Sequence, residues 1–320
     1  MTDTANVTQI YQGDAELRDQ IRSILTTDKR LSQALLSKEA GFSAATLNQW
    51  LLGKYAGDNE SIDNKLRIWL DAHNSRRAAR NAMPVAPDFV VTPTAKRILG
   101  TLGYAQMAGD MAVIYGNPGV SKSDTNKYYS KNSPNVWIAT MTPSTSGVVT
   151  ALQEIAEALG LDADGGARAI KKRICKRVLD TNGLLICDEA QHLSVAALDE
   201  IRAIHDATGV AIALVGNEGV FARMHGGREA TKLDRLQSRI GKRLKIPQAT
   251  TEDIKALIAA WGITDEKCER TLVEIARRPG ALRTLTKTLR LASMYAAAEG
   301  RAVCCEDVRA AATELMDGGK

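Results

Sequence analysis

The chain has 320 residues, of which 44% are hydrophobic and 25% charged, so it is long enough for two or three domains with cores of their own. It contains no run of about 18 apolar residues and residues 1–12 are polar, which excludes a membrane span and a secretory signal and predicts a cytoplasmic protein. Five cysteines without C-x-x-C spacing exclude a zinc site and a disulfide framework.

The net charge of +5 is unevenly distributed. Residues 1–72 carry 8 Lys and Arg against 10 Asp and Glu, whereas the remainder carries 34 against 27. We therefore expect any attraction to a polyanion mainly in residues 73–320.

Residues 1–72 have a helical pattern and form the first predicted domain, in which residues 31–54 look like a helix-turn-helix. Gly41 suits the turn and Ser43 suits the N-cap of the second helix. The predicted core positions of that helix are Leu47, Trp50 and Leu51. The side chains expected to face a DNA groove are Ser43, Ala44, Asn48 and Gln49. Because the domain lacks a basic excess, a small bundle with no DNA contact is the alternative.

Residues 73–93 are predicted to be a linker. Their arginines are followed by Pro84, Pro87 and Pro93, and this stretch cannot form a regular helix throughout.

Residues 94–249 alternate short apolar runs with helical patterns and form the second predicted domain. We expect strands at residues 111–115, 136–140, 184–187, 211–215 and 243–246. Strands that alternate with helices indicate an α/β fold with a mainly parallel five-stranded sheet and helices on both faces.

The first motif follows the first of these strands, where a glycine-rich turn leads into a helix. Backbone N–H groups in such a turn suit the β- and γ-phosphates of ATP, Lys122 would reach those phosphates, and the Ser123 hydroxyl would bind Mg²⁺. Residue 121 is Ser where the usual pattern has Gly, and Ser bends less freely. The residues expected to hold the nucleotide are Gly116, Asn117, Pro118, Gly119, Val120, Ser121, Lys122, Ser123 and Asp124.

Two segments of this domain are candidates for contact with DNA phosphates. The hydroxyl-rich segment after the second strand supplies Thr142, Ser144 and Thr145. A basic helix supplies Lys171, Lys172, Arg173, Lys176 and Arg177. The alternative for the basic helix is an ordinary solvated face.

Polar residues at later strand ends complete the predicted site. Asp188 is expected to hold the magnesium ion, and Glu189 to polarise an attacking water. Asn217 ends the next strand and would orient that water, although Asn also favours turns. Arg239, or as second choice Arg235, would reach the nucleotide of a neighbouring subunit unless these arginines form a solvated basic face.

Residues 250–320 are predicted to be a small helical domain, with helices at residues 251–260, 265–276, 281–298 and 306–315. Arg283, near the start of the third helix, would touch the phosphates from this lid.

Together these motifs resemble the AAA+ ATPases, and Asp-Glu-Ala-Gln-His at residues 188–192 resembles the Mu B-like transposition ATPases among them. The resemblance covers nearly the whole chain. It implies an ATPase that uses ATP and Mg²⁺, assembles with itself into a helical oligomer on double-stranded DNA, and delivers target DNA to a transposase that it activates.

Two other functions are compatible with the motifs. A replication initiator or helicase loader shares the same core and the arginine segment. A sequence-specific helix-turn-helix repressor would use the nucleotide only as a regulatory ligand.

Overall fold

The computed structural model describes residues 14–28, 31–82, 87–219 and 233–317. The chain divides into two compact units, Met1–Met83 and Pro84–Lys320, which are described separately below. Within the described ranges, no helix has both the length and the apolar character needed to cross a membrane.

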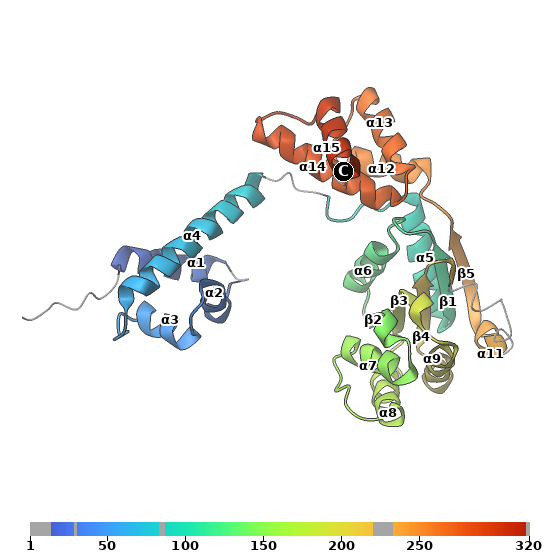
Figure 1. The fold of residues 1–320 in the computed structure, drawn as a ribbon. Helices are drawn as coiled ribbons and strands as arrows, with labels where there is room; N and C mark the ends of the chain where they lie inside the picture. Colours follow the sequence, from blue (N-terminus) through green and yellow to red (C-terminus); the bar gives the residue numbers. More distant parts are fainter. Residues whose placement is uncertain (1–13, 29–30, 83–86, 220–232, 318–320) are drawn as a thin grey trace, which may run out of the picture. The chain divides into compact units, whose positions relative to one another are not determined.

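The described part of the N-terminal unit is helical (Figure 1). Its helices are α1 (Ala15–Thr27), α2 (Gln33–Ala40), α3 (Ala44–Leu51) and α4 (Asn59–Ala82). As predicted, Gly41 forms the turn after α2 in the left-handed conformation, at φ 79°, and the Ser43 side chain caps α3. Leu47, Trp50 and Leu51 are buried, which confirms the predicted core face of α3.

Helix α4 corrects the predicted start of the linker at residue 73. The helix continues to Ala82 because no proline occurs before Pro84 and the intervening residues include good helix formers. His73 stacks on Trp69 with ring centroids 4.8 Å apart, and Arg76 pairs with Glu39 at 3.7 Å. Residues 83–86 lie outside the described ranges.

The second unit is built on a parallel five-stranded sheet in the order β2-β3-β4-β1-β5 (Figure 1). The strands are β1 (Met111–Gly116), β2 (Val136–Thr140), β3 (Leu184–Asp188), β4 (Ala211–Gly216) and β5 (Ile240–Ile246). All five predicted strands are present. β5 begins at Ile240 and not at residue 243. The prediction started too late because the sequence before Arg243 contains no apolar run that would indicate a strand.

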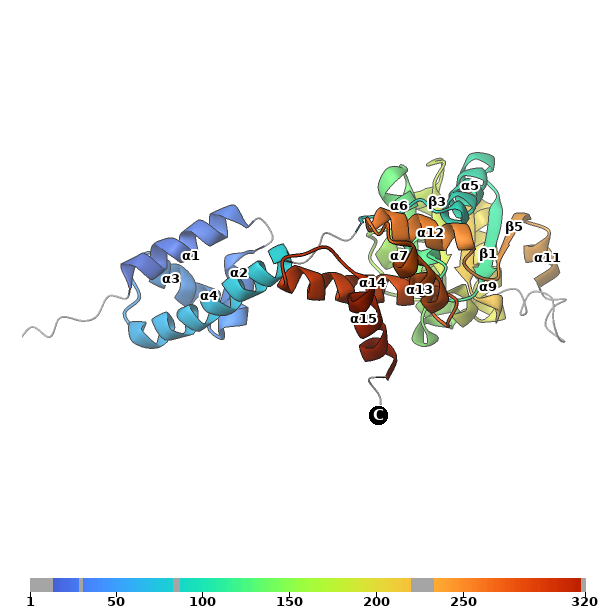
Figure 2. The ribbon, with the colours of Figure 1, turned by 90° about the horizontal axis from the view of Figure 1, so that it is seen from above.

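Helices cover both faces of this sheet, and each face has its own core (Figure 2). One core contains apolar residues of α7 (Val148–Ala158), α8 (Ala167–Val178) and α9 (Val195–Thr208). The other contains Ile98 and Leu102 of α5 (Pro93–Ala108), with Tyr129 of α6 (Lys122–Asn132) packed against it. The loops around the sheet also contain the short helices η1 (Pro143–Thr145), η2 (Ala190–His192) and α11 (Asp234–Gln237).

The lid consists of α12 (Thr251–Ala260), α13 (Glu266–Ala276), α14 (Ala281–Ala298) and α15 (Cys305–Asp317). These are the four predicted helices, with ends within two residues of those expected, around a separate apolar core. Figure 1 shows the four helices gathered at one end of the sheet. The lid is joined to the core by buried Asp253, which accepts hydrogen bonds from the Thr94 N–H at 2.8 Å and the Thr94 hydroxyl at 2.6 Å.

Candidate functional site

The glycine-rich loop between β1 and α6 is fixed between two other segments. A Cβ atom on Gly116, whose φ is 156°, would lie 1.7 Å from the Ile246 carbonyl oxygen at the end of β5. A Cβ atom on Gly119, whose φ is 82°, would lie 2.0 Å from the Gly280 carbonyl oxygen. Both positions therefore require glycine, because the backbone of the loop touches the backbone of its neighbours.

Ser121 adopts the conformation for which the motif normally uses glycine. Its φ is 62° and its ψ is 24°, in the left-handed region, which costs a non-glycine residue about 1–2 kcal/mol. Its carbonyl accepts hydrogen bonds from the Thr125 N–H at 3.0 Å and the Thr125 hydroxyl at 2.7 Å. The loop thus forms its turn with Ser at a local cost in free energy.

Lys122 is held against the loop that it follows. Its Nζ donates to the carbonyls of Gly116 and Asn117, both at 2.8 Å. Burial lowers the pKa of Lys122, and the nearby Glu189 and Asp188 carboxylates oppose that shift. The ammonium group is therefore placed among carbonyl and carboxylate oxygens at the mouth of the loop.

The structure brings Ser123 and Asp188 together. Asp188 is the buried last residue of β3, and burial raises its pKa, while a hydrogen bond from Ser123 lowers it. A carboxylate and a hydroxyl are oxygen donors of the kind that Mg²⁺ prefers, and that ion usually keeps several waters. No group of three or more His, Cys, Asp or Glu side chains suited to a metal occurs in the described residues.

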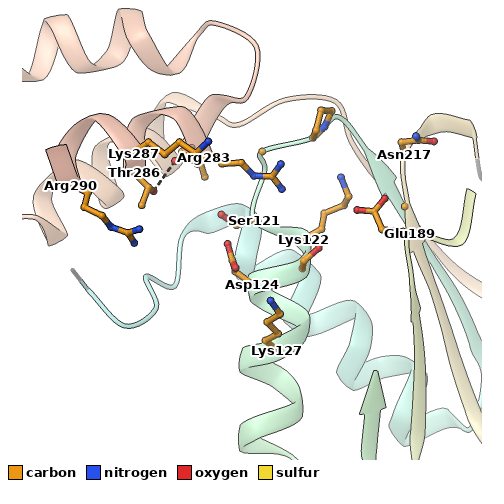
Figure 3. A pocket seen from close by; sticks show the side chains of 15 residues that line it. Ser121, Lys122, Asp124, Lys127, Glu189, Asn217, Arg283, Thr286, Lys287 and Arg290 are labelled. Carbon is orange, nitrogen blue, oxygen red and sulfur yellow. Dashed lines mark hydrogen bonds between the residues drawn. The ribbon is translucent and has the colours of Figure 1, made fainter. Parts of the chain in front are cut away.

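A cavity of about 470 Å³ lies over the loop and unites most of the predicted site (Figure 3). Its walls include Pro118, Gly119, Ser121, Lys122, Ser123, Asp124, Glu189, Asn217 and Arg283. Gly116 and Asn117 contribute the carbonyls that hold Lys122, whereas Val120 is buried in the core and does not line the cavity. Lys287 and Arg290, which the sequence motifs did not indicate, reach the same cavity from α14.

Arg283 is positioned by a direct bond between lid and loop. The Leu282 N–H donates to the Gly119 carbonyl at 3.1 Å, so the first turn of α14 is tied to the phosphate loop. Figure 3 shows the Arg283 side chain extending from α14 toward Lys122.

Asn217 stabilises a turn and also lines the cavity. Its Oδ1 accepts a hydrogen bond from the Gly219 N–H at 2.7 Å, as expected of an Asn that stabilises a turn. It also lines the cavity opposite the loop.

A second cavity, of about 660 Å³, shares Ser121, Asp124 and Arg290 with the first. Its other walls include Phe89, Tyr128, Leu257 and Trp261, and the Phe89 and Tyr128 rings stack with centroids 4.3 Å apart. The aromatic walls suit a flat nucleobase. Sequence reasoning missed them because these residues are scattered along the chain and belong to no recognisable motif.

Comparison with known proteins matches the two halves of this unit to two families. Residues 106–224 match the AAA domain, and residues 238–315 match the C-terminal domain of the Mu B transposition protein. The ATP-dependent target DNA activator B of Escherichia phage Mu is 36% identical over 311 residues, which cover 97% of this chain and 96% of that protein. This chain belongs to the Mu B family.

A further relative agrees with that assignment. The Mu-like prophage FluMu DNA transposition protein B of Haemophilus influenzae is 36% identical over 82% of this chain and 91% of its own length. A solved structure of the Thermotoga maritima RuvB Holliday junction branch migration motor is 16% identical, covers 73% of each chain and has a TM-score of 0.45.

The two candidate trans-acting arginines of this Mu B-family chain do not line its own cavity. Both are exposed, Arg235 on α11 and Arg239 directly before β5. The Arg239 guanidinium donates to Asp206 of α9 at 2.8 Å and lowers the pKa of that carboxyl group.

The predicted DNA-contacting cations of α8 divide into two groups. Lys171 pairs with Glu200 at 3.0 Å, Arg173 donates to the Asp162 carbonyl at 3.0 Å, and Arg177 lies over the Trp137 ring. Lys172 and Lys176 are exposed and make no ion pair with any residue that the structure describes. Of the five predicted cations, Lys172 and Lys176 are therefore the two that are exposed without an ion pair or a ring contact in the described part of the chain.

The remaining DNA candidates are exposed or half-exposed. Thr142 and Thr145 form a capping box around η1, and the hydroxyls of Thr142 and Ser144 are 2.8 Å apart. In the N-terminal unit, Ser43, Ala44, Asn48 and Gln49 all face solvent on α3.

Proposed function

We propose that this chain is a DNA-dependent ATPase that assembles on duplex DNA when ATP is bound, presents that DNA to a transposase and activates it. The observation that carries the proposal is the convergence of Lys122, Ser123, Glu189 and Arg283 on one cavity, with Asp188 hydrogen-bonded to Ser123. Membership of a family whose phage Mu protein is named an ATP-dependent target DNA activator supports the DNA-related part. The expected place of action is the cytoplasm of the host cell.

ATP would lie with its phosphates over the loop and its base against the aromatic side chains of the second cavity. The loop N–H groups would bind the β- and γ-phosphates, and Lys122 would exchange its two carbonyl partners for phosphate oxygens. Because the Leu282 N–H is hydrogen-bonded to the Gly119 carbonyl, a change of the loop on nucleotide binding would also shift the lid.

Ser123 and Asp188 would hold Mg²⁺, which would neutralise charge on the phosphates. Glu189 would polarise the attacking water and Asn217 would orient it toward the γ-phosphate. Arg283 would stabilise the charge that develops on the phosphoryl oxygens.

We infer that the active form is a helical homo-oligomer. Arg239 would enter the cavity of the neighbouring subunit and contact its γ-phosphate, with Arg235 as the second choice. Exposure of both arginines away from their own cavity supports this arrangement. Hydrolysis would remove the γ-phosphate that joins two subunits, so the subunits would separate and the oligomer would dissociate.

DNA would be held through its phosphates, without strong sequence preference. Lys172, Lys176 and the hydroxyls of Thr142, Ser144 and Thr145 are the proposed contacts in the ATPase unit. Ser43, Asn48 and Gln49 would add contacts from the helix-turn-helix.

Negative-stain electron microscopy with a random linear duplex tests the assembly. Long filaments with ATP, few with ADP, and long-lived filaments for Glu189→Gln are expected, because that variant binds ATP without hydrolysing it. A short footprint on one palindromic sequence, formed without ATP, would instead identify a repressor. Stable association with a replicative helicase in place of a transposase would identify a loader.

A further inference from the structure

Gln191 links two residues of the proposed catalytic site. It lies in η2, the single turn that follows Glu189, and its Nε2 donates to Glu189 Oε2 at 2.5 Å. Its Oε1 accepts a hydrogen bond from the Asn217 N–H at 3.2 Å. One side-chain amide therefore connects the end of β3 to the end of β4 beside the cavity.

The chemistry of the partners fixes the orientation of this amide. An ionised carboxylate only accepts hydrogen bonds, and a backbone N–H only donates them. Rotating the Gln191 amide by 180° would set oxygen against oxygen at Glu189 and N–H against N–H at Asn217. Gln191 thus has one orientation in which both bonds form.

Glu189 needs such support because its backbone is in an uncommon conformation. Its φ is 53°, in the left-handed region, and its N–H donates to Asp188 Oδ1 at 3.0 Å. These constraints fix where the side chain begins, but they leave the rotation of its carboxylate free. The Gln191 amide holds one carboxylate oxygen and leaves the other available to a water in the cavity.

We propose that Gln191 is a positioning residue for ATP hydrolysis, which aims the Glu189 carboxylate and couples it to the segment around Asn217. This inference rests on the proposed role of Glu189 as the group that polarises water. A γ-phosphate that moves Asn217 would move the Gln191 amide with it and so change the direction of the Glu189 carboxylate.

The test compares Gln191→Met with wild-type protein in DNA-stimulated ATP turnover and in equilibrium binding of ATP. Met has a similar length but cannot form either hydrogen bond, so we expect kcat to fall by about tenfold or more, as for other misaligned catalytic groups. The dissociation constant for ATP should change by less than about twofold, since Gln191 is not among the residues that line the cavity. His192→Ala, in the same turn, is the matched control and should retain the wild-type kcat.

A double-mutant cycle separates positioning from a general structural effect. In a Glu189→Gln background, Gln191→Met should cause no further loss, because the group that it positions is already absent. Equal losses in both backgrounds, or a loss of ATP affinity that accompanies the loss of kcat, would overturn the positioning role of Gln191 but not the proposed role of Glu189. A Glu189→Gln variant that turns over ATP at the wild-type rate would overturn the proposed role of Glu189 and this inference with it.

Discussion

At the scale of single residues, the candidate site contains backbone conformations that are costly for the residues that adopt them. Ser121 and Glu189 both have positive φ, although neither is a glycine. Such strain is maintained only where the surrounding structure imposes it, and it occurs often in functional sites. The motif pattern indicated the strain at Ser121, since glycine normally stands there. It gave no sign of the contact between Glu189 and Gln191, because that contact depends on how the ends of β3 and β4 meet.

Ser121→Gly should stabilise the protein. Relief of the left-handed strain gains about 1–2 kcal/mol, and the greater freedom of an unfolded glycine offsets about 0.5–1 kcal/mol of it. Urea unfolding should therefore show a net gain of about 0.5–1 kcal/mol. Ser133→Gly is the matched control, because Ser133 has an ordinary φ of −132° and should lose stability. A loss of stability in both variants would contradict the account of Ser121.

At the scale of elements, one of the contacts between core and lid is made by a buried carboxylate. Burial raises the pKa of Asp253, but hydrogen bonds from Thr94 and Thr250 outweigh it and leave the pKa below its usual value. A carboxyl group with a lowered pKa in the folded state stabilises the protein above the pKa it has when unfolded, about 4. That contribution disappears as the pH falls through the folded-state pKa.

Asp253→Asn should remove this contribution and with it part of the acid sensitivity. We expect a loss of about 1–3 kcal/mol at pH 7, because an amide cannot accept all the hydrogen bonds of a carboxylate. The difference from wild type should shrink as urea unfolding is repeated from pH 5 down to pH 3. Glu274→Gln, at an exposed position on α13, serves as control. A difference that stays constant with pH would show that the ionised form of Asp253 is not what stabilises this contact.

The exposed lysines of α8 give a second prediction at this scale. Exchanging Lys172 and Lys176 for Gln should weaken binding to all duplex sequences and reduce the slope of log K against log salt by about two. Fluorescence anisotropy at several salt concentrations measures both quantities, and Lys96→Gln on α5 is the control. An unchanged slope would mean that α8 presents only a solvated face.

Element boundaries show where sequence patterns succeed and fail. The sequence predicts β1, β3 and β4 almost to the residue, because these strands are buried along their whole length and their sequences are continuous apolar runs. Edge strand β5 alternates buried and exposed residues, so its first half carries no comparable signal. The end of α4 was misplaced because its arginines indicated a linker, although nothing in them stops a helix.

At the scale of the whole molecule, the proposal requires that subunits complete each other's sites. Arg239→Ala should lack activity because it cannot supply the trans arginine, and Lys122→Ala because it cannot bind ATP. A mixture of the two should recover ATP turnover, since Lys122→Ala subunits would supply Arg239 to the intact phosphate loops of Arg239→Ala subunits. Repeating the mixing experiment with Arg235→Ala in place of Arg239→Ala shows which of the two arginines acts in trans. Absence of recovery with either arginine variant would contradict action in trans.

The central claim is that residues 116–123 bind the triphosphate of ATP together with magnesium, with Ser at position 121. Retention of labelled ATP by the full chain, with and without Mg²⁺, tests it most directly, with Lys122→Ala as the comparison. We predict magnesium-dependent retention by the wild-type protein and at least about a hundredfold weaker binding by the variant, since two or more charge-assisted phosphate contacts are lost. Equal retention by the two proteins, or none by the wild type, would contradict the claim.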